Sequence, residues 1–407
     1  MKLKFFLVLM AVIIFMSGKT FAAIEITDER ATPKYWTRID GDKIILSAQE
    51  ISQLNLKMRM NDAYAADLKN FPQKISAENL KARILKASND VGVEPQENQN
   101  LNAIVGDTKI KYAVTTERVN VRLLPQSLTG EKFDKLQGTA LDPAEAVAVM
   151  WESADGEYIF AQTRNYFGWI EKNKLAFTTR EVWLNYVKPE NFIVVTANKK
   201  FVEVGGRNIL FQMGAVIPLS KNLGDKNFWF AQIPINDGGK FREVTVKIFK
   251  DDTVHKNFLP CTTNNFIRQS FKFLGDAYDW GGLKDSVDCS AFTSDIYRSM
   301  GIEIPRDADR QEFCMPIVAK FNQQSYDERI KILKSSPTGA LIFKPGHVLM
   351  FLGNDANGTP IAIHAASSYY LDDKKIYVSK VLVSEMSYPN DYGGSTVEKL
   401  TGINFVK

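Results

Sequence analysis

The chain has 407 residues, of which 45% are hydrophobic and 24% are charged. At about 100–200 residues per domain, this length predicts two to four domains with sizeable apolar cores. Lysine and arginine number 51 against 47 acidic residues, so the chain lacks the basic excess typical of phosphate binding, and we expect no nucleic-acid partner.

Residues 1–22 predict a secretory signal peptide. Lys2 and Lys4 precede an apolar run at residues 5–16, and small residues follow up to Ala22 and Ala23. The alternative is a membrane anchor, but the run is shorter than the ~20 residues that a spanning helix needs. No cysteine lies near the cleavage point, which argues against a lipid anchor. We therefore expect a periplasmic or secreted protein with no stable membrane anchor after signal cleavage.

Three cysteines, Cys261, Cys289 and Cys314, are too few for a disulfide framework. In an oxidising compartment, an odd number leaves at least one free thiol or an intermolecular bridge. Pairing of Cys261 with Cys314 stays open, because the sequence does not fix the Cα separation that a disulfide requires.

Residues 24–112 are polar, rich in lysine and asparagine, and lack the apolar density of an independent core. A helix is predicted at SAENLKARILKA, where Ser76 is the N-cap and Leu80, Ile84 and Leu85 form one apolar stripe. We interpret this region as a wrapping or docking segment.

Short runs of β-branched and aromatic residues follow, broken by turn residues every ~8–12 positions, which is typical of small all-β modules. The first module spans residues 115–178, with ERVNVRLLP near its start and a Gly-Trp pair near its end. The second spans residues 192–250 and contains a Gly-Gly turn and the run FWFAQIPI. We expect Trp169 and Trp229 to lie in the module cores rather than to bind a ligand.

Residues 256–407 show helix signals followed by strand signals, which predicts an α+β domain. Helices are predicted at TTNNFIRQSFKFLG, which ends at Gly275, and at CSAFTSDIYRSMG, which ends at Gly301. The runs ALIF, HVLMFLG and IAIHAA predict three buried strands.

Cys289 begins the second of these helices. Free backbone N–H groups and the helix dipole favour a thiolate there, and they lower the thiol pKa below the ~8.5 of a free cysteine. Asp288 opposes this effect as a neighbouring negative charge, unless a helix cap or a cationic substrate group occupies it. Alone, the Asp-Cys-Ser triplet also fits a buried, inert cysteine.

A nucleophilic thiol needs a base, and the chain has three histidines. His255 lies in the stretch before the domain, where we expect it to be solvated. His347 and His364 lie on consecutive predicted strands, joined by NDANGT with its Asn-Gly turn signal. A turn near residues 355–356 places the two imidazoles opposite each other within one residue of register.

These positions predict Cys289 as the nucleophile, His347 as the base and then the acid, and His364 as the residue that orients His347. Each histidine taken alone also fits a core position. A metal site formed by the three residues is a further alternative, but the short CxxC or HxxxH spacings typical of zinc are absent. We expect no metal and no cofactor.

Five motifs of this domain, GDAYDWGG, VDCSAF, GIEIPRDADRQ, GHVLMFLG and IHAA, resemble in their order those of the NlpC-type cell-wall cysteine peptidases, a papain-like family. The first β-module resembles bacterial SH3-like barrels, and the second is similar to a more diverged barrel. The chain thus looks like a multi-domain protein: a C-terminal α+β papain-like NlpC-type domain preceded by two SH3-like β-barrels and an N-terminal wrapping segment. Ala291 departs from the family, which usually has glycine there.

The resemblance implies that Cys289, His347 and His364 are catalytic. It further implies that the Tyr278 hydroxyl stabilises the oxyanion together with the Cys289 backbone N–H. A position as a core aromatic is the alternative for Tyr278.

The resemblance also implies substrate contacts at Asp288, Ser290, Asp307 and Trp280. Asp288 would pair with a free α-amine of the substrate, and Trp280 would form part of the wall. Helix capping is the alternative role for both aspartates. Glycines 281 and 282 allow a close backbone approach.

By resemblance, the substrates are peptidoglycan stem peptides or muropeptides with a free N-terminal L-Ala. The bond cut is the γ-D-glutamyl-L-diamino acid bond, by a Cys-His-His thiolate mechanism through an acyl-enzyme. Two alternatives stay open: a catalytically inactive peptidoglycan-binding scaffold, and an acyl hydrolase or transferase of the same fold that acts on another amide or thioester. The sequence leaves the identity of the diamino acid and the oligomeric state open.

Overall fold

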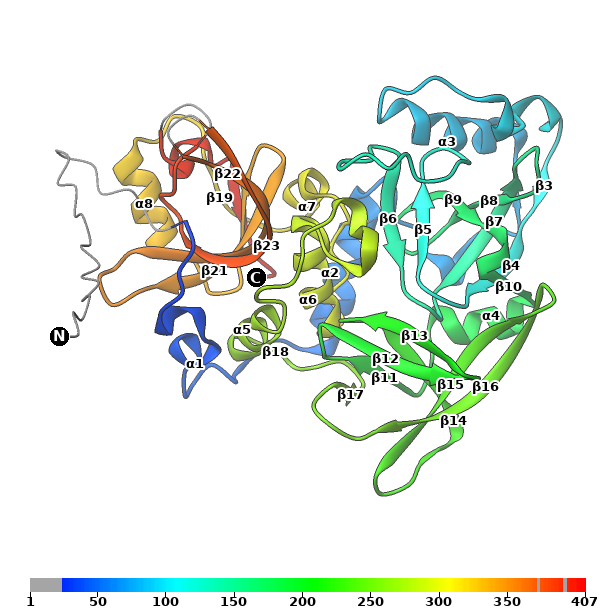
Figure 1. The fold of residues 1–407 in the computed structure, drawn as a ribbon, viewed down its shortest axis with the longest axis horizontal. Coiled ribbons are helices and arrows are strands. Elements are labelled where there is room, and N and C mark those ends of the chain that lie inside the picture. Colours follow the sequence, from blue (N-terminus) through cyan, green and yellow to red (C-terminus); the bar gives the residue numbers. More distant parts are fainter. Residues whose placement is uncertain (1–23, 372–373, 391–393) are drawn as a thin grey trace, which may run out of the picture.

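The computed structural model describes residues 24–371, 374–390 and 394–407, so the predicted signal peptide lies outside the described residues. Figure 1 shows the C-terminal sheet at one end of the molecule, the two β-modules at the other, and several helices between them. Among the described residues, no helix has the length and apolar character of a membrane span.

The N-terminal segment contributes short elements that contact both ends of the molecule (Figure 1). Strand β1 pairs with β18 (Cys261–Thr262), α2 packs against α7 (Ala308–Cys314), and α3 packs against β9 (Phe167–Glu171). Its elements are η1 (Glu29–Ala31), α1 (Pro33–Trp36), β1 (Ile44–Leu46), α2 (Ala48–Asn61), η2 (Leu68–Asn70), β2 (Lys74–Ile75), α3 (Ala77–Asn89), η3 (Glu97–Gln99), η4 (Leu101–Ala103) and β3 (Thr108–Lys109).

Helix α3 forms where the sequence predicts it. The Ser76 hydroxyl accepts a hydrogen bond from the Asn79 N–H and so caps the helix, as expected. Leu80 and Ile84 are fully buried, whereas Leu85 lies at the half-buried edge of the stripe. The helix lacks a core of its own, and its apolar face is buried against the first β-module.

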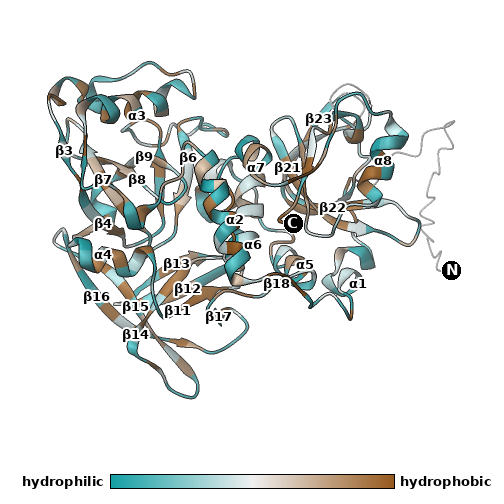
Figure 2. Cartoon of the chain, turned by 180° about the vertical axis from the view of Figure 1, so that it is seen from behind, coloured by the Kyte–Doolittle hydropathy of each residue, from teal (hydrophilic) through white to brown (hydrophobic). Residues whose placement is uncertain are grey.

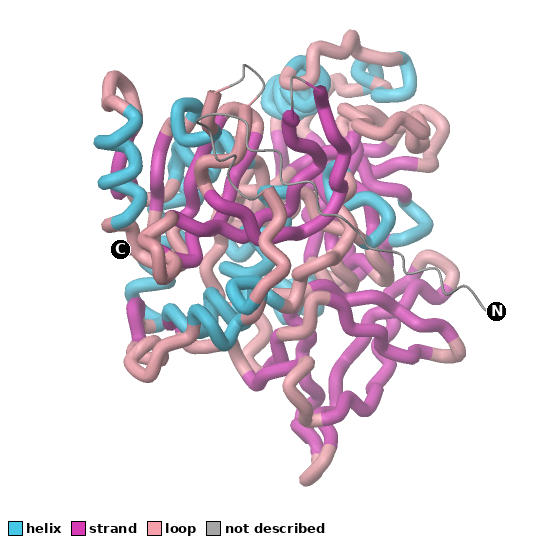
Figure 3. The backbone as a smooth tube through the Cα atoms, turned by 60° about the vertical axis from the view of Figure 1, so that its left-hand side comes forward, coloured by secondary structure: helices cyan, strands magenta, loops and turns pink. Residues whose placement is uncertain are grey.

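Most strands of the two predicted β-modules form one continuous sheet, because β10 pairs in parallel with β16 through Phe177 and Lys240, whereas β12 and β13 form a separate two-stranded sheet. The first module contains β4 (Lys111–Thr115), β5 (Val119–Arg122), β6 (Gln137–Leu141), β7 (Ala146–Glu152), β8 (Tyr158–Gln162), β9, η5 (Lys172–Lys174) and β10 (Leu175–Thr178). The second contains α4 (Arg180–Val187), β11 (Phe192–Val195), β12 (Lys199–Val204), β13 (Arg207–Gln212), β14 (Val216–Gly224), β15 (Phe228–Asp237), β16 (Lys240–Phe249) and β17 (Val254–Lys256). Figure 3 shows the strands of the second module projecting from the lower end of the molecule.

The tryptophans of the two modules differ in exposure. Trp169 is fully buried, which confirms its predicted place in the core. Trp229 is half-buried at the edge of the same core, and the Lys250 ammonium lies 4.0 Å from its ring centroid. Figure 2 shows hydrophobic residues concentrated on the strands and mostly hydrophilic peripheral loops.

The C-terminal domain has the predicted helices and strands. The runs ALIF, HVLMFLG and IAIHAA lie in β20, β21 and β22 of a sheet ordered β19-β24-β20-β21-β22-β23, and α6 packs against β21 and β22. Besides α7 and β18, the elements are α5 (Thr263–Phe271), η6 (Trp280–Asp285), α6 (Cys289–Ser299), β19 (Ile317–Lys320), α8 (Tyr326–Lys334), β20 (Leu341–Lys344), β21 (His347–Asn354), β22 (Pro360–Leu371), β23 (Lys374–Glu385), η7 (Thr396–Lys399) and β24 (Gly402–Asn404).

A buried ion cluster joins α6 to both β-modules. The Arg298 guanidinium donates to the carboxylates of Asp142 and Glu145 in the first module, the latter at 2.9 Å, and to the Met213 carbonyl at 2.9 Å. The side chains of Arg298 and Asp142 are only 9% and 2% exposed. Separating Arg298 from Asp142 would leave buried charges without partners. The cluster therefore holds α6 against the two β-modules.

Candidate active site

Two glycines before Cys289 let the first β-module contact the loop that leads to it. Gly281 and Gly282 have φ values of 63° and 74°, in the left-handed region. A Cβ atom at Gly281 would lie 2.3 Å from the Gln137 side chain. The Gln137 amide donates to the Gly281 carbonyl at 3.1 Å, and Arg118 donates to the Gly282 carbonyl at 3.3 Å. The sequence predicts a close backbone approach at these glycines, and the first β-module makes it.

Asp288 is the N-cap of α6, and Arg306 holds its carboxylate. One oxygen accepts from the Ala291 N–H at 2.8 Å and the other from the Gly281 N–H at 3.0 Å. Both oxygens also accept from the Arg306 guanidinium, at 3.1 and 2.7 Å. Burial alone would raise the pKa of Asp288, but the charge and hydrogen bonds of Arg306 outweigh it and lower the pKa. The capping role of Asp288 is thus present, and pairing with a substrate amine stays a prediction that would require Arg306 to share the carboxylate.

Arg306 also connects this network to the barrel. Its Nε donates to the Thr139 hydroxyl on β6 at 2.8 Å, and one Nη donates to the Ser290 hydroxyl at 2.8 Å. Ser290, which we expect to contact substrate, is buried within the network. No sequence signal singled out Arg306 beyond its place in GIEIPRDADRQ, because its partners lie on other elements.

The Cys289 thiol lies at the first turn of α6 and is 8% exposed. The expected lowering of its pKa does not occur: burial, followed by the charge of Asp288, raises the pKa of Cys289 to about 12. Burial disfavours the thiolate and outweighs the effect of the helix N-terminus. The backbone N–H of Val348 is directed at the thiol, so Cys289 lies beside the strand that begins with His347. The resting thiol keeps its proton and needs a base.

The two imidazoles of the domain form a hydrogen-bonded pair. His347 Nε2 lies 2.7 Å from His364 Nδ1. Met350 is paired with Ile363, so His364 lies about two residues away from the predicted position directly opposite His347. The rings therefore meet diagonally across β21 and β22, within the reach of aromatic side chains.

Ser384 completes this arrangement from β23. His364 Nε2 lies 3.2 Å from the buried Ser384 hydroxyl. We assign the tautomers in which His347 Nε2–H donates to His364 Nδ1 and His364 Nε2–H donates to Ser384. This assignment leaves Nδ1 of His347 as a proton acceptor.

Both histidines are held in the neutral form. Burial lowers the pKa of His347 well below its ordinary 6.5, and His364 and Lys344 act in the same direction. Burial, together with Lys344, lowers the pKa of His364 to about 3. His347 is therefore a neutral base at physiological pH, as proton transfer from a thiol requires.

We expect Ser384→Ala to lower kcat about 10-fold with little change in KM, because His364 would lose the hydrogen bond that fixes its tautomer. Ser384→Thr, which keeps a hydroxyl, should restore most of the rate. Steady-state kinetics check this, with Ser368→Ala on β22 as the matched serine control. Equal effects of the two alanine variants, or no rescue by threonine, would contradict a positioning role for Ser384.

Tyr278 and Trp280 flank the same loop. Tyr278 is half-buried, and burial raises its pKa, with the neighbouring Cys289 and Asp288 acting in the same direction. Its hydroxyl therefore keeps the proton that an oxyanion donor needs. Trp280 is 37% exposed, and its ring centroid lies 6.0 Å from that of Phe133 in the first module.

Asp307 occupies the N-cap position of α7 but makes no side-chain capping bond. Asp307 is half-buried, and its desolvation raises the pKa of the carboxyl to about 7, although Arg306 and Arg310 act in the opposite direction. Its charge influences the pKa values of Tyr64 and Tyr166, whose rings stack at a centroid distance of 4.8 Å. Asp307 is thus a carboxylate that has no hydrogen-bond partner among the described residues and lies near two tyrosines.

The other two cysteines are free thiols, as Cys289 is, so the pairing of Cys261 with Cys314 that the sequence left open is not formed in this structure. His255 is exposed, as expected. Within the described ranges, no group of three or more histidine, cysteine, aspartate or glutamate side chains is arranged to hold a metal ion.

Comparison with protein families identifies two parts of the chain. Residues 275–379 match the NlpC/P60 family, and residues 125–171 match an SH3 domain of the SH3b1 type. The C-terminal domain is an NlpC/P60 domain. NlpC/P60 is a family of cysteine peptidases, so the expected peptidase family and an SH3-like domain before it are confirmed. The second barrel and the wrapping role of the N-terminal segment stay predictions.

Known proteins resemble the chain to different extents. A gamma-D-glutamyl-L-lysine dipeptidyl-peptidase of Bacillus subtilis (strain 168) is 29% identical over 154 residues, which cover 36% of this chain and 46% of the relative. The match thus spans about half the length of that relative. An NlpC/P60 endopeptidase from Photobacterium damselae subsp. piscicida has a TM-score of 0.71 at 17% identity, covering 96% of this chain and 97% of its own. An NlpC/P60 family protein from Bacillus cereus ATCC 10987 has a TM-score of 0.52 at 18% identity, and the match covers 72% of this chain and 99% of that protein. The two structures show a shared fold.

Proposed function

We propose that the NlpC/P60 domain hydrolyses peptidoglycan stem peptides at the γ-D-glutamyl-L-diamino acid bond, outside the cytoplasm. The observation that carries this proposal is Cys289 at the start of α6, beside β21, whose neutral His347 pairs with His364 on β22. The activity for which the Bacillus subtilis relative is named supports the choice of bond. The family and the SH3b1-type domain support a peptidoglycan-related substrate.

Catalysis begins with a neutral thiol and a neutral imidazole. As the Cys289 sulfur attacks the γ-glutamyl carbonyl carbon, the thiol proton moves to Nδ1 of His347. The Tyr278 hydroxyl and the Cys289 backbone N–H donate to the oxyanion that forms. Because burial disfavours both ions of the resting pair, we expect proton transfer to accompany the attack.

The proton that His347 takes from the thiol is then transferred to the leaving group. The His347 imidazolium protonates the amine of the diamino acid as the C–N bond breaks, which leaves a thioester on Cys289. His347 next takes a proton from water as the water attacks the thioester, and it returns that proton to the departing sulfur. His364 holds His347 in one tautomer through both half-reactions.

We assign the free α-amine of the substrate to Asp307 instead of Asp288. Asp288 is neutralised by Arg306 through two hydrogen bonds, whereas Asp307 has no hydrogen-bond partner among the described residues. An ammonium group near Asp307 would gain a charge-assisted hydrogen bond and would favour the ionised carboxylate. The nearby Tyr64 and Tyr166, the latter from the barrel, support a site that accepts short peptides with a free end.

We expect L-Ala-γ-D-Glu-diamino acid tripeptides to have a kcat/KM at least ~10-fold above that of their N-acetyl counterparts, because acetylation removes the ammonium that Asp307 would bind. Asp307→Asn should shrink this preference and leave the rate on the N-acetyl peptide nearly unchanged. The exposed Asp309→Asn is the matched control on α7. Equal kcat/KM values for free and acetylated peptides in the wild-type protein would refute the amine site, and cleavage of neither peptide would refute the proposed reaction.

The pH dependence of kcat/KM distinguishes the role of His347 from that of Asp307. His347 has a lowered pKa, so its basic form persists to below pH 6.5 and is lost only as the pH falls further. Asp307 has a pKa raised to about 7, so its anionic form is present above pH 7 and is lost as the pH falls through that value. We expect kcat/KM for the free-amine peptide to fall first near pH 7 or somewhat below, and kcat/KM for the N-acetyl peptide to fall only at lower pH. Coincident acid limbs for the two substrates would contradict these assignments.

A further inference from the structure

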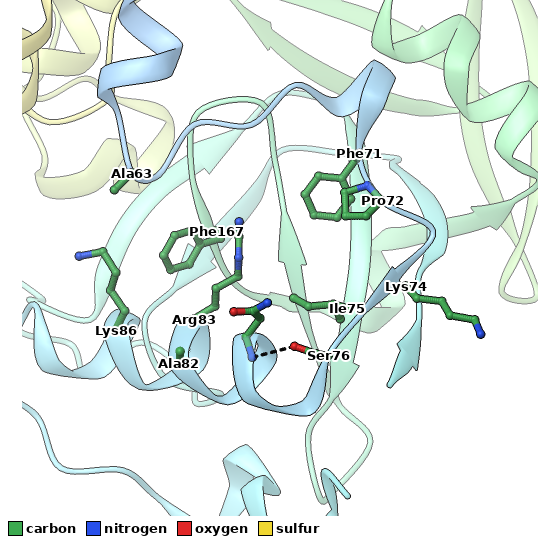
Figure 4. A pocket seen from close by; sticks show the side chains of 11 residues that line it. Ala63, Phe71, Pro72, Lys74, Ile75, Ser76, Ala82, Arg83, Lys86 and Phe167 are labelled. Carbon is green, nitrogen blue, oxygen red and sulfur yellow. Dashed lines mark hydrogen bonds between the residues drawn. The ribbon is translucent and has the colours of Figure 1, made fainter. Parts of the chain in front are cut away.

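We propose that a groove between α3, the segment at residues 71–76 that precedes it and Phe167 of β9 binds a short peptide through its free C-terminal carboxylate. The groove has a volume of about 560 Å³, and Figure 4 shows the side chains that line it. None of the residues placed in the candidate active site lines it. The volume exceeds that of a single small anion and suits a peptide end.

Arg83 on α3 indicates an anionic ligand. Burial lowers the pKa of Arg83, and no carboxylate of the described residues lies within ion-pair distance of its guanidinium. One Nη donates to the Gln162 side-chain oxygen, and the guanidinium carbon lies 5.7 Å from the Phe167 ring centroid. A partly desolvated guanidinium without a counter-ion is unfavourable, and its planar fork matches a carboxylate.

The charges around the groove favour the same ligand. Its lining includes Lys74, Arg83 and Lys86 but no aspartate or glutamate. Lys86 is already paired with Asp90 at 2.8 Å. Lys74 and Arg83 therefore leave the groove with a net positive charge, to which a carboxylate is complementary.

Apolar side chains line the side of the groove that faces Arg83. Phe71, Pro72 and Ile75 line the groove across from Arg83 in Figure 4, and Phe167 lies beside the guanidinium. A carboxylate bound at Arg83 would place the side chain of the C-terminal residue against this wall. A small aliphatic side chain, such as the methyl of alanine, suits both the apolar surface and the available space.

The groove adjoins the aromatic side chains near Asp307. The Phe167 ring stacks on Tyr64 at 4.4 Å, and Tyr64 stacks on Tyr166 at 4.8 Å. The stacked rings of Phe167, Tyr64 and Tyr166 would thus lie between a peptide end bound at Arg83 and the proposed amine site at Asp307. It would give the protein a second contact with peptide, separate from the scissile bond.

Binding to the full chain carrying Cys289→Ala tests the proposal without turnover. The probes are acetyl-Ala-Ala with a free carboxylate and the same peptide as its C-terminal amide, titrated by calorimetry at low salt. We expect the acid to bind at least ~10-fold more tightly than the amide, because only the acid pairs with the guanidinium. Arg83→Gln should reduce the affinity for the acid to that for the amide, whereas Lys81→Gln on the same helix, outside the groove, should leave it unchanged.

The Arg83 Nε–H resonance locates the bound probe in the protein labelled with ¹⁵N-arginine. We expect it to shift with the acid and not with the amide. Equal affinities for acid and amide in the protein that retains Arg83 would overturn the proposal, as would an acid preference that survives Arg83→Gln. Stronger binding of inorganic phosphate than of the acid would overturn the choice of a peptide. Because the readout is binding to a protein that does not turn over, its failure is distinguishable from failure of the proposed hydrolysis.

Discussion

Cys289→Ala is expected to lower kcat/KM on the L-Ala-γ-D-Glu-diamino acid tripeptide by at least ~10⁴-fold, and His347→Ala to have a similar effect. The thiol and the imidazole act as one unit, because the thiol with its pKa near 12 cannot ionise at neutral pH without a base. The double variant should therefore be no slower than either single variant. Product formation measured by liquid chromatography checks the three rates.

The matched control is Cys314→Ala, which removes another buried, free thiol on α7. It should retain most of the activity, since the charged groups that act on Cys314 are Asp62, Arg310 and Asp309. Substantial hydrolysis by Cys289→Ala would contradict the assigned nucleophile. Inhibition of the wild-type protein by a chelator, reversed by zinc, would contradict the metal-free proton transfers.

Arg306→Met is expected to lower the free energy of unfolding by roughly 3–5 kcal/mol, since it leaves the buried Asp288 carboxylate without its partner. It should also slow catalysis, because Asp288 caps the helix that carries Cys289. Asp288→Asn alone should destabilise the protein in the same way, by leaving the guanidinium unpaired. The double variant Asp288→Asn/Arg306→Met should recover part of the loss.

Urea unfolding of the four proteins measures this coupling. Arg268→Met is the control, because Arg268 pairs with Asp42 on the surface and its removal should change stability little. If Arg306→Met destabilises no more than the control does, Arg306 is not the partner on which Asp288 depends. If the double variant is as unstable as the sum of the single variants, the two side chains act independently.

Local sequence signals predicted the elements that carry the catalytic atoms. A polar cap, an amphipathic run and a terminal glycine define α6, and an apolar run ending at a turn defines β21, so Cys289 and His347 could be placed from neighbouring residues alone. The His347–His364 pair was also predictable, although the register differs by about two residues. The diagonal contact tolerates that error because both side chains stay on one face of the sheet.

Features that depend on partners far along the chain were not predictable in this way. Arg306 meets Thr139, 167 positions away, and Ser384 reaches His364 only because β22 and β23 pair. Pairing of β10 with β16 joins the two β-modules that the sequence predicts as separate units. The raised pKa of Cys289 has the same origin, since the burial of the thiol comes from the whole domain, whereas local sequence sets only its position on the helix.

Mass spectrometry of the products released from a muropeptide mixture tests the central claim most directly. The wild-type protein is predicted to release L-Ala-γ-D-Glu and peptides that begin with the diamino acid, and the Cys289→Ala protein is predicted to release neither. Cleavage at a different bond, or the same products from Cys289→Ala, would contradict the account.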